Sequence, residues 1–190
     1  MLGKQAEAEA SLAKATALID FEQMSSNLTY FRYVQFLLTG ERCYLALARE
    51  QKLLLTLLLA EARLRRDFWH NLSVHEDIEQ RWREGAKTEV VWLAKADVPL
   101  GRPLTDDDLL PITWTLDDGG GDTAVYQQAG KVGLRRHRLR RLADEAFAQG
   151  ALPTDADLAQ ALGISVRTVE RDRAALAEAG FVLRTRGYGR

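Results

Sequence analysis

The side chains best suited to specific chemistry lie in residues 166–179, where two arginines recur four positions apart. Arg167 and Arg171 therefore share one face of the helix predicted over these residues, and Thr168 and Glu170 flank that face. A guanidinium group can donate two hydrogen bonds to the edge of a guanine, and a hydroxyl or carboxyl group can read neighbouring bases. This chemistry predicts contacts with base edges in the major groove of double-stranded DNA.

The residues before this helix predict a second helix and a tight turn that would hold it in place. Thr154 is a suitable N-cap for a short helix, because Asp157 follows it at the spacing of a capping box. Gly163 can adopt positive φ in the turn, and Ser165 caps the helix that follows. An earlier helix with an apolar face would end at Gly150. Two short helices joined in this way form a helix-turn-helix, which directs its second helix into a groove of DNA.

Basic side chains on both sides of this unit predict contacts with the DNA backbone. Residues 131–141 contain six basic residues, one histidine and no acidic residue, a composition that suits phosphate contact. The alternative is a solvated helix end whose basic residues pair with nearby acidic groups. Residues 181–183 predict a strand, and the basic and aromatic residues that follow it predict a wing. The predicted backbone contacts are Lys131, Arg135, Arg136, Arg138, Ser165, Arg173, Arg184, Arg186 and Tyr188.

The residues across the turn resemble a known family of regulators. Their spacing is similar to that of the helix-turn-helix in the DeoR-type transcriptional regulators, and the resemblance implies that fold. One departure is Arg173, where DeoR-type sequences usually carry an aliphatic residue, so that this side chain must reach solvent or phosphate. The matching residues are Ala159, Gly163, Ile164, Ser165, Thr168, Val169 and Asp172.

A longer stretch, from about Trp92 to Gly187, resembles the prokaryotic family catalogued as domain of unknown function 1670. The segments that carry this resemblance are Pro111–Leu116 and Val166–Asp172. The resemblance covers roughly half of the chain, and it implies a fold more than a role.

The elements that must position this unit follow from the periodicity of the remaining sequence. Helices are predicted over residues 4–19, 41–66 and 74–84. The longest of them carries a seam at coiled-coil spacing, which suits internal packing or a dimer contact. Residues 88–94 and 112–116 predict two paired strands, joined by a loop whose helical turn is capped by Thr105. The seam residues are Tyr44, Leu47, Gln51, Leu54, Leu58, Ala62 and Arg65.

The predicted fold is mainly α with a small β element, divided into two units. An N-terminal helical and two-stranded unit over residues 1–120 would be a partner or effector domain, and a C-terminal winged helix-turn-helix over residues 131–190 would bind DNA. A flexible, glycine-rich boundary is predicted within residues 117–130. Residues 131–190 hold twelve basic and seven acidic side chains, whereas residues 1–130 hold 14 and 20. Such asymmetry is expected when only one unit faces phosphates.

Composition argues against several other classes of function. The single cysteine, Cys43, excludes an internal disulfide and a cysteine-based zinc site, and the spacing of His70 and His75 does not place both on one helix face. The acidic residues 106–108 and 117–122 lack the pattern of a calcium loop. With no recognisable catalytic set either, we predict no metal, cofactor or enzyme activity. The tryptophans Trp69, Trp82, Trp92 and Trp114 are predicted to be core residues.

The apolar stretch over residues 53–60 is too short to span a membrane, and residues 1–11 do not form a secretory signal. We therefore expect a cytoplasmic, homodimeric, sequence-specific DNA-binding protein that regulates transcription, and the sequence does not identify a small-molecule effector. The alternative is an accessory or docking subunit of a mobile element or multiprotein complex. If the first reading holds, Arg167→Ala relaxes the sequence preference, whereas Arg138→Ala weakens binding to all sequences alike.

Overall fold

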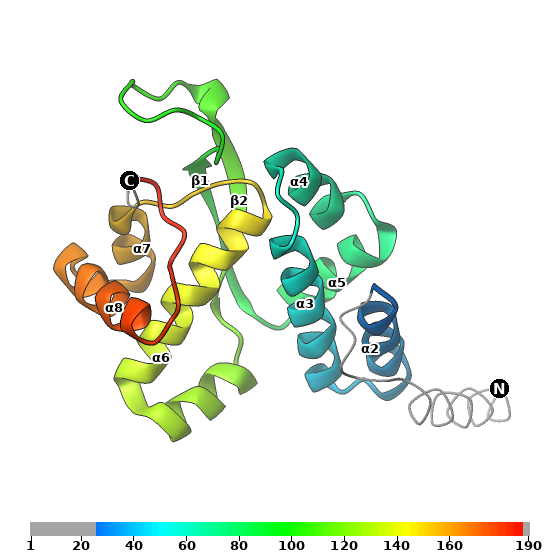
Figure 1. The fold of residues 1–190 in the computed structure, drawn as a ribbon. Coiled ribbons are helices and arrows are strands. Elements are labelled where there is room, and N and C mark those ends of the chain that lie inside the picture. The colour runs from blue at the N-terminus through cyan, green and yellow to red at the C-terminus, as the bar shows by residue number, and fades with distance from the viewer. Residues whose placement is uncertain (1–25, 188–190) are drawn as a thin grey trace, which may run out of the picture.

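The computed structural model describes residues 26–187, which form seven α-helices, one 3-10 turn and one two-stranded antiparallel sheet (Figure 1). The helix predicted over residues 4–19 and the predicted contact Tyr188 lie outside the described residues. Within them, no helix has both the length and the apolar character needed to span a membrane. In chain order the elements are α2 (Ser26–Thr39), α3 (Arg42–Leu57), α4 (Ala62–His70), α5 (Ser73–Arg83), β1 (Lys87–Ala94), η1 (Asp106–Asp108), β2 (Leu109–Asp117), α6 (Gly120–Ala148), α7 (Asp155–Leu162) and α8 (Val166–Glu178).

The prediction of a single long helix over residues 41–66 is wrong, because the helix is interrupted between α3 and α4. The guanidinium of Arg65 donates hydrogen bonds of 2.8 and 2.7 Å to the carbonyls of Leu59 and Ala60, which the break leaves outside a helix. Leu58, a predicted seam residue, is 67% exposed at this corner. Burial also follows a face different from the predicted seam, since Leu45, Ala48, Arg49, Lys52 and Thr56 are the buried residues of α3.

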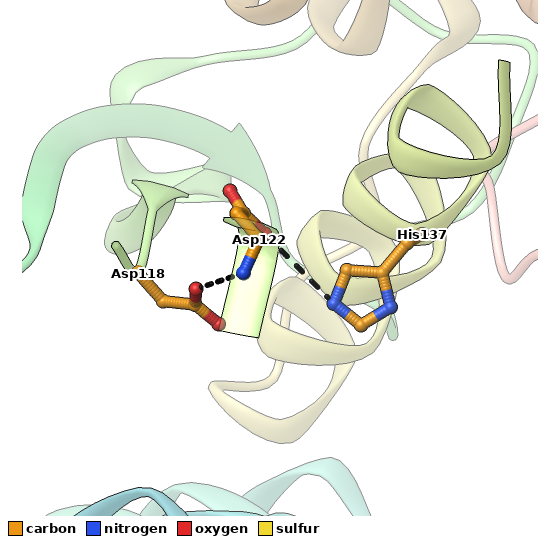
Figure 2. Close-up of side chains that lie close together, drawn as sticks. All are labelled: Asp118, Asp122 and His137. Carbon is orange, nitrogen blue, oxygen red and sulfur yellow. Dashed lines mark hydrogen bonds and ion pairs between the residues drawn. The ribbon is translucent and has the colours of Figure 1, made fainter. Parts of the chain in front are cut away.

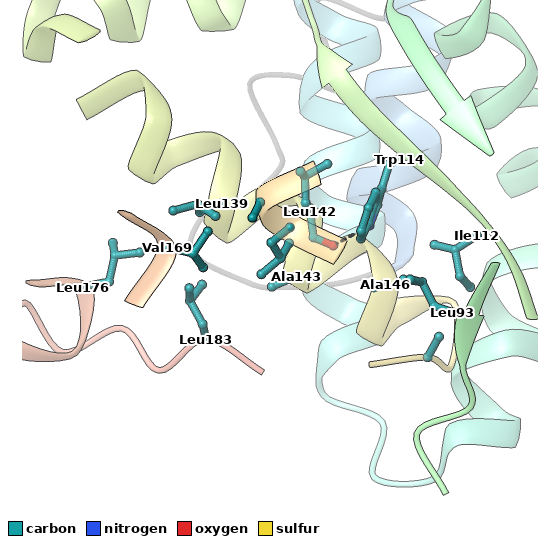
Figure 3. Close-up of a cluster of buried hydrophobic side chains, with 13 residues drawn as sticks. Leu93, Ile112, Trp114, Leu139, Leu142, Ala143, Ala146, Val169, Leu176 and Leu183 are labelled. Atoms are coloured by element: carbon teal, nitrogen blue, oxygen red, sulfur yellow. Dashed lines mark hydrogen bonds between the residues drawn. The ribbon is translucent and has the colours of Figure 1, made fainter. Parts of the chain in front are cut away.

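Two buried clusters organise the molecule. The smaller one lies among α2, α3 and α5 and contains Tyr33, Leu45, Ala48, Ile78 and Trp82. The larger one joins the hairpin to the last three helices (Figure 3). The sequence-based prediction placed the two strands in one unit with the N-terminal helices. In the structure, the inward residues of the strands pack on α6, α7 and α8. The members of the larger cluster are Leu93, Ile112, Trp114, Leu139, Leu142, Ala143, Ala146, Ala151, Leu158, Ala159, Val169, Leu176 and Leu183.

The edge of β2 that faces away from β1 is closed by side chains of α6 and of its C-cap residue, Gln149. Gln149 accepts a hydrogen bond from the N–H of Thr113 and donates one to its carbonyl, both at 2.9 Å. Glu145 accepts from the N–H of Thr115 at 2.8 Å, and Arg141 donates to the carbonyl of Thr115 at 3.1 Å. Because the three side chains are four residues apart, one face of α6 replaces the missing neighbouring strand.

The flexible boundary predicted within residues 117–130 is also wrong, because α6 begins at Gly120. The carboxylate of Asp118 accepts a hydrogen bond of 2.6 Å from the N–H of Asp122, and Asp122 is buried. The helix changes direction at Gly130, whose φ of 64° and ψ of −168° are not helical. Glycines in this region therefore begin and bend a helix rather than forming a loose linker.

Residues 181–183 form no strand, so the predicted wing is not confirmed in the described part of the chain. After Gly180 the chain runs without a strand partner along the C-terminal helices, and Leu183 enters the larger cluster. The N–H of Arg186 donates a hydrogen bond of 2.8 Å to the carbonyl of Pro153. These contacts tie the segment to the body of the molecule.

Trp92 is the exception among the four tryptophans, since Trp69, Trp82 and Trp114 are buried as predicted while Trp92 is 64% exposed. It lies on the outward face of β1 beside Val90, which is 61% exposed. The prediction that Trp92 belongs to the core is therefore wrong, because the alternation of β1 turns even-numbered residues away from the cluster.

Candidate nucleic-acid interface

The turn between α7 and α8 forms as its residues predict. Thr154 and Asp157 make the capping box at the start of α7, with hydrogen bonds of 2.7 Å from Thr154 N–H to the carboxylate and 3.2 Å from Asp157 N–H to the hydroxyl. Gly163 ends α7 in the left-handed conformation, with φ 62° and ψ 37°. The N–H of Ile164 then donates to the carbonyl of Ala159 at 3.0 Å. The chain thus reverses over a few residues between two short helices.

Ser165 is the N-cap of α8, and Thr168 lies in the first turn of that helix. The hydroxyl of Ser165 accepts a hydrogen bond of 3.2 Å from the N–H of Thr168, and the two hydroxyl groups lie 2.9 Å apart. Ser165 is exposed and Thr168 is half-buried. Both predicted DNA contacts therefore also serve as the N-terminal cap of the helix.

The two faces of α8 differ sharply in burial. Val169, Asp172 and Leu176 are its buried residues, whereas the predicted base contacts Arg167, Glu170 and Arg171 are all exposed. Figure 1 shows α8 on the side of α6 that faces away from α3, so the N-terminal helices do not cover it. Within residues 26–187, neither Arg167 nor Arg171 makes a hydrogen bond or an ion pair. This face therefore presents two unneutralised guanidinium groups to solvent.

The two basic residues nearest to α8 in the run 131–141 pair with a buried acid of that helix. Arg135 and Arg136 contact the carboxylate of Asp172 at 2.5 and 3.3 Å, and Asp172 is fully buried. Burial raises the pKa of Asp172, but the hydrogen bonds and charges of the two arginines outweigh it and hold that pKa below its ordinary value. These pairs fix the position of α8 on α6.

Two further arginines of the run pair with acidic residues between the end of β2 and the first turn of α6. Arg138 contacts Asp117 at 2.6 Å and Asp122 at 2.7 Å, and Arg141 contacts Asp118 at 3.0 Å and Asp122 at 2.7 Å. These arginines hold the two parts of α6 together across the bend at residue 130. The described structure thus gives the run the pairing role that the sequence offered as its alternative, except at Lys131, which is exposed and makes no ion pair among the described residues.

The remaining predicted backbone contacts also have partners within the chain. Arg173 forms an ion pair with Asp155, which links α8 to α7. Arg184 contacts Asp144 at 3.1 Å. Arg186 donates hydrogen bonds to the carbonyls of residues 98 and 99 at 2.9 and 3.0 Å, in the loop that follows β1. The acidic partners lie far away in the sequence, and only the tertiary fold identifies them.

Asp118, Asp122 and His137 form a cluster of metal-ligand types that the sequence did not bring together (Figure 2). One ligand atom of each lies within 4.8 Å of the others. The carboxylate of Asp122, however, already accepts hydrogen bonds from Arg138 at 2.7 Å and from Arg141 at 2.7 and 3.1 Å. Two guanidinium charges on the central ligand oppose a cation, so the cluster fits an ion-pair network.

Comparison with curated proteins and with solved structures finds no match to this chain. A family model, by contrast, matches residues 57–190. The matched region contains α4 and α5, the hairpin and the three C-terminal helices, and therefore the whole of the larger buried cluster. The chain belongs to the family described as Protein of unknown function (DUF1670).

Proposed function

We propose that this protein binds double-stranded DNA through a helix-turn-helix made of α7 and α8, and that it regulates transcription by recognising specific sequences. In this proposal α8 lies in the major groove, with Arg167 and Arg171 directed at guanine edges. The observation that carries it is the contrast among the arginines. Arg135, Arg136 and Arg173 have carboxylate partners, whereas the two arginines on the exposed face of α8 have none among the described residues.

The unpaired guanidinium groups of Arg167 and Arg171 project from a helix that is anchored to the rest of the protein. Asp172 anchors α8 to α6 through Arg135 and Arg136, and side chains of α6 anchor that helix to β2. A recognition helix held in this way keeps its backbone in place before DNA arrives, which lowers the entropic cost of binding. Glu170 on the same face can accept a hydrogen bond from the amino group of a cytosine.

The proposal is tested by selecting bound fragments from a random duplex pool with the full chain, and then measuring affinities by fluorescence anisotropy. Arg167→Ala and Arg171→Ala should each weaken binding to the selected sequence by about 5- to 100-fold and relax the preference at one position. Arg83→Ala is the matched control, because Arg83 is an exposed arginine on α5. It should leave both properties unchanged.

Lys131→Ala should weaken binding to all sequences alike and reduce the slope of log K against log salt by about 0.9. Recovery of no duplex above background, or effects at Arg167 and Arg171 equal to those of the control, would contradict DNA recognition by α8. Retained structure with no duplex binding would then favour the alternative, a docking module whose exposed α8 face contacts another protein.

A further inference from the structure

The outer edge of β1 carries backbone groups that nothing in residues 26–187 uses. Since Thr113 and Thr115 direct their N–H and C=O groups to α6, their partners across the ladder, Val90 and Thr88, direct theirs away from β2. The same parity holds further along, where the carbonyl of Ala94 accepts from Leu152 N–H at 2.9 Å. The outward groups of residues 88, 90 and 92 have no such partner in the described structure.

The two edges of the sheet are therefore treated differently. The β2 edge is closed by three side chains of α6, as described above, whereas the β1 edge is open beside two exposed apolar side chains. Val90 is 61% and Trp92 is 64% exposed, and both stand on one face of the strand. Soluble proteins usually protect an edge strand with charge, proline, a bulge or a cover. In β1 such features are confined to its start, where Lys87 and Glu89 are exposed and the register shifts between Lys87 and Thr88. An open edge combined with an exposed tryptophan indicates a surface that another strand covers.

We propose that this strand is β1 of a second copy of the chain, paired antiparallel about a two-fold axis at Val90. Thr88 would then face Trp92 of the second copy, and every open N–H and C=O group of the three outward residues would find a partner. On the outward face Val90 would contact its counterpart, and each Trp92 would cover the Thr88 opposite it. The two hairpins would thus form one four-stranded sheet.

Hydrogen bonding and charge select this register over its neighbours. A shift that centres the pairing on Glu89 would place two carboxylates directly opposite each other, which is destabilising. A shift that centres it on Val91 would require the carbonyl of Ala94, which already accepts from Leu152, and would set Lys87 against Lys95. Only the register centred on Val90 avoids both conflicts.

One short strand pair with these side chains buries less than the roughly 1,200 Å² of the smaller stable interfaces. We therefore expect a reversible dimer with a dissociation constant in the micromolar range, which sedimentation velocity across a concentration series would detect. Val90→Lys and Trp92→Lys should each weaken dimerisation by at least tenfold. Leu64→Lys is the matched control, because Leu64 is a leucine 49% exposed on α4 and is not a residue of the predicted seam. Leu47→Lys reports on the alternative dimer seam along α3.

Cysteine cross-linking tests the register directly, in a Cys43→Ser background because Cys43 is exposed. In a hydrogen-bonded antiparallel pair the Cα atoms lie about 5.5 Å apart, which a disulfide spans. Val90→Cys should therefore form a cross-linked dimer under mild oxidation, whereas Glu89→Cys and Val91→Cys should not. Cross-linking at residue 89 or 91 in place of residue 90 would overturn the proposed register.

A chain that stays monomeric at all concentrations, or a dimer lost with Leu47→Lys and kept with Trp92→Lys, would overturn the proposed surface. These measurements are made without DNA, so their outcome does not depend on the proposed DNA-binding function. A dimer that binds no duplex would contradict only the DNA proposal. A monomer that binds duplex specifically would contradict only the pairing of β1.

Discussion

Removal of the Glu145 carboxylate should strongly destabilise the polar interior of the protein. Glu145 is fully buried and accepts hydrogen bonds of 2.8 Å from both Arg49 and the N–H of Thr115. Glu145→Ala would leave a buried N–H without a partner, which costs about 1–3 kcal/mol. It would also leave Arg49 and Lys52, both buried, facing the single carboxylate of Glu79. The uncompensated charge brings the expected loss to about 3–5 kcal/mol.

Urea unfolding followed by circular dichroism at pH 7 measures this loss. Glu145→Gln keeps the size of the side chain and one acceptor, so it should lose about 2 kcal/mol. Glu50→Ala, an exposed glutamate on α3, is the control and should change the free energy of unfolding by less than about 0.5 kcal/mol. A loss below about 1 kcal/mol for Glu145→Ala would refute the reasoning, since it would mean that the buried charges are compensated elsewhere.

Three further changes test the same polar interior. Burial lowers the pKa of Lys52 to about 8 from 10.5, so the folded state releases this proton before the unfolded state does. The free energy of unfolding should therefore rise between about pH 8 and 10, and Lys52→Met should abolish that rise in urea titrations. Burial raises the pKa of Asp172 but the arginine hydrogen bonds hold it below 3.8, so this pair stabilises above that pH and its contribution is lost as pH falls further. Asp172→Asn should remove about 2–3 kcal/mol at pH 7, because it weakens hydrogen bonds to charged groups, and it should flatten the acid limb of the stability curve. Gln149→Ala should cost about 1–3 kcal/mol and speed amide exchange at Thr113, because it opens the protected edge of β2.

The sequence-based predictions that the structure confirms are those that rest on short-range patterns. The capping residues Thr154 and Ser165 and the left-handed Gly163 each act on backbone groups within a few positions, and the structure forms both helices and the turn between them. The strands and the capped turn at Thr105 follow for the same reason. Local signals of this kind can be read from a short segment of sequence, because they do not depend on contacts with distant residues.

The errors arose where distant residues decide the local structure. The break after α3 is stabilised by Arg65, whose guanidinium also reaches the carbonyl of Phe147 at 2.9 Å, on another helix. No periodicity in residues 41–66 records that contact. The start of α6 at residues 118–122 is likewise secured by Arg138 and Arg141, which follow a bend in the chain. Glycines alone indicated flexibility there because their tertiary partners are invisible in sequence.

The basic run 131–141 shows why a charge pattern alone does not identify a DNA contact. An arginine supplies free charge to phosphate only if its own fold has not already neutralised it, and Asp172 is 36 or 37 positions from its two partners. Sequence therefore could not separate Arg135, which is paired, from Arg171, which has no partner within residues 26–187. If the free charges are the ones that bind, the salt dependence of duplex affinity should follow Lys131, Arg167 and Arg171 rather than the whole run. If the slope of log K against log salt were as steep as contacts from all six basic residues of the run predict, the internal ion pairs would have to open on binding. The packing of α8 on α6 would then be less stable in the complex than in the free protein.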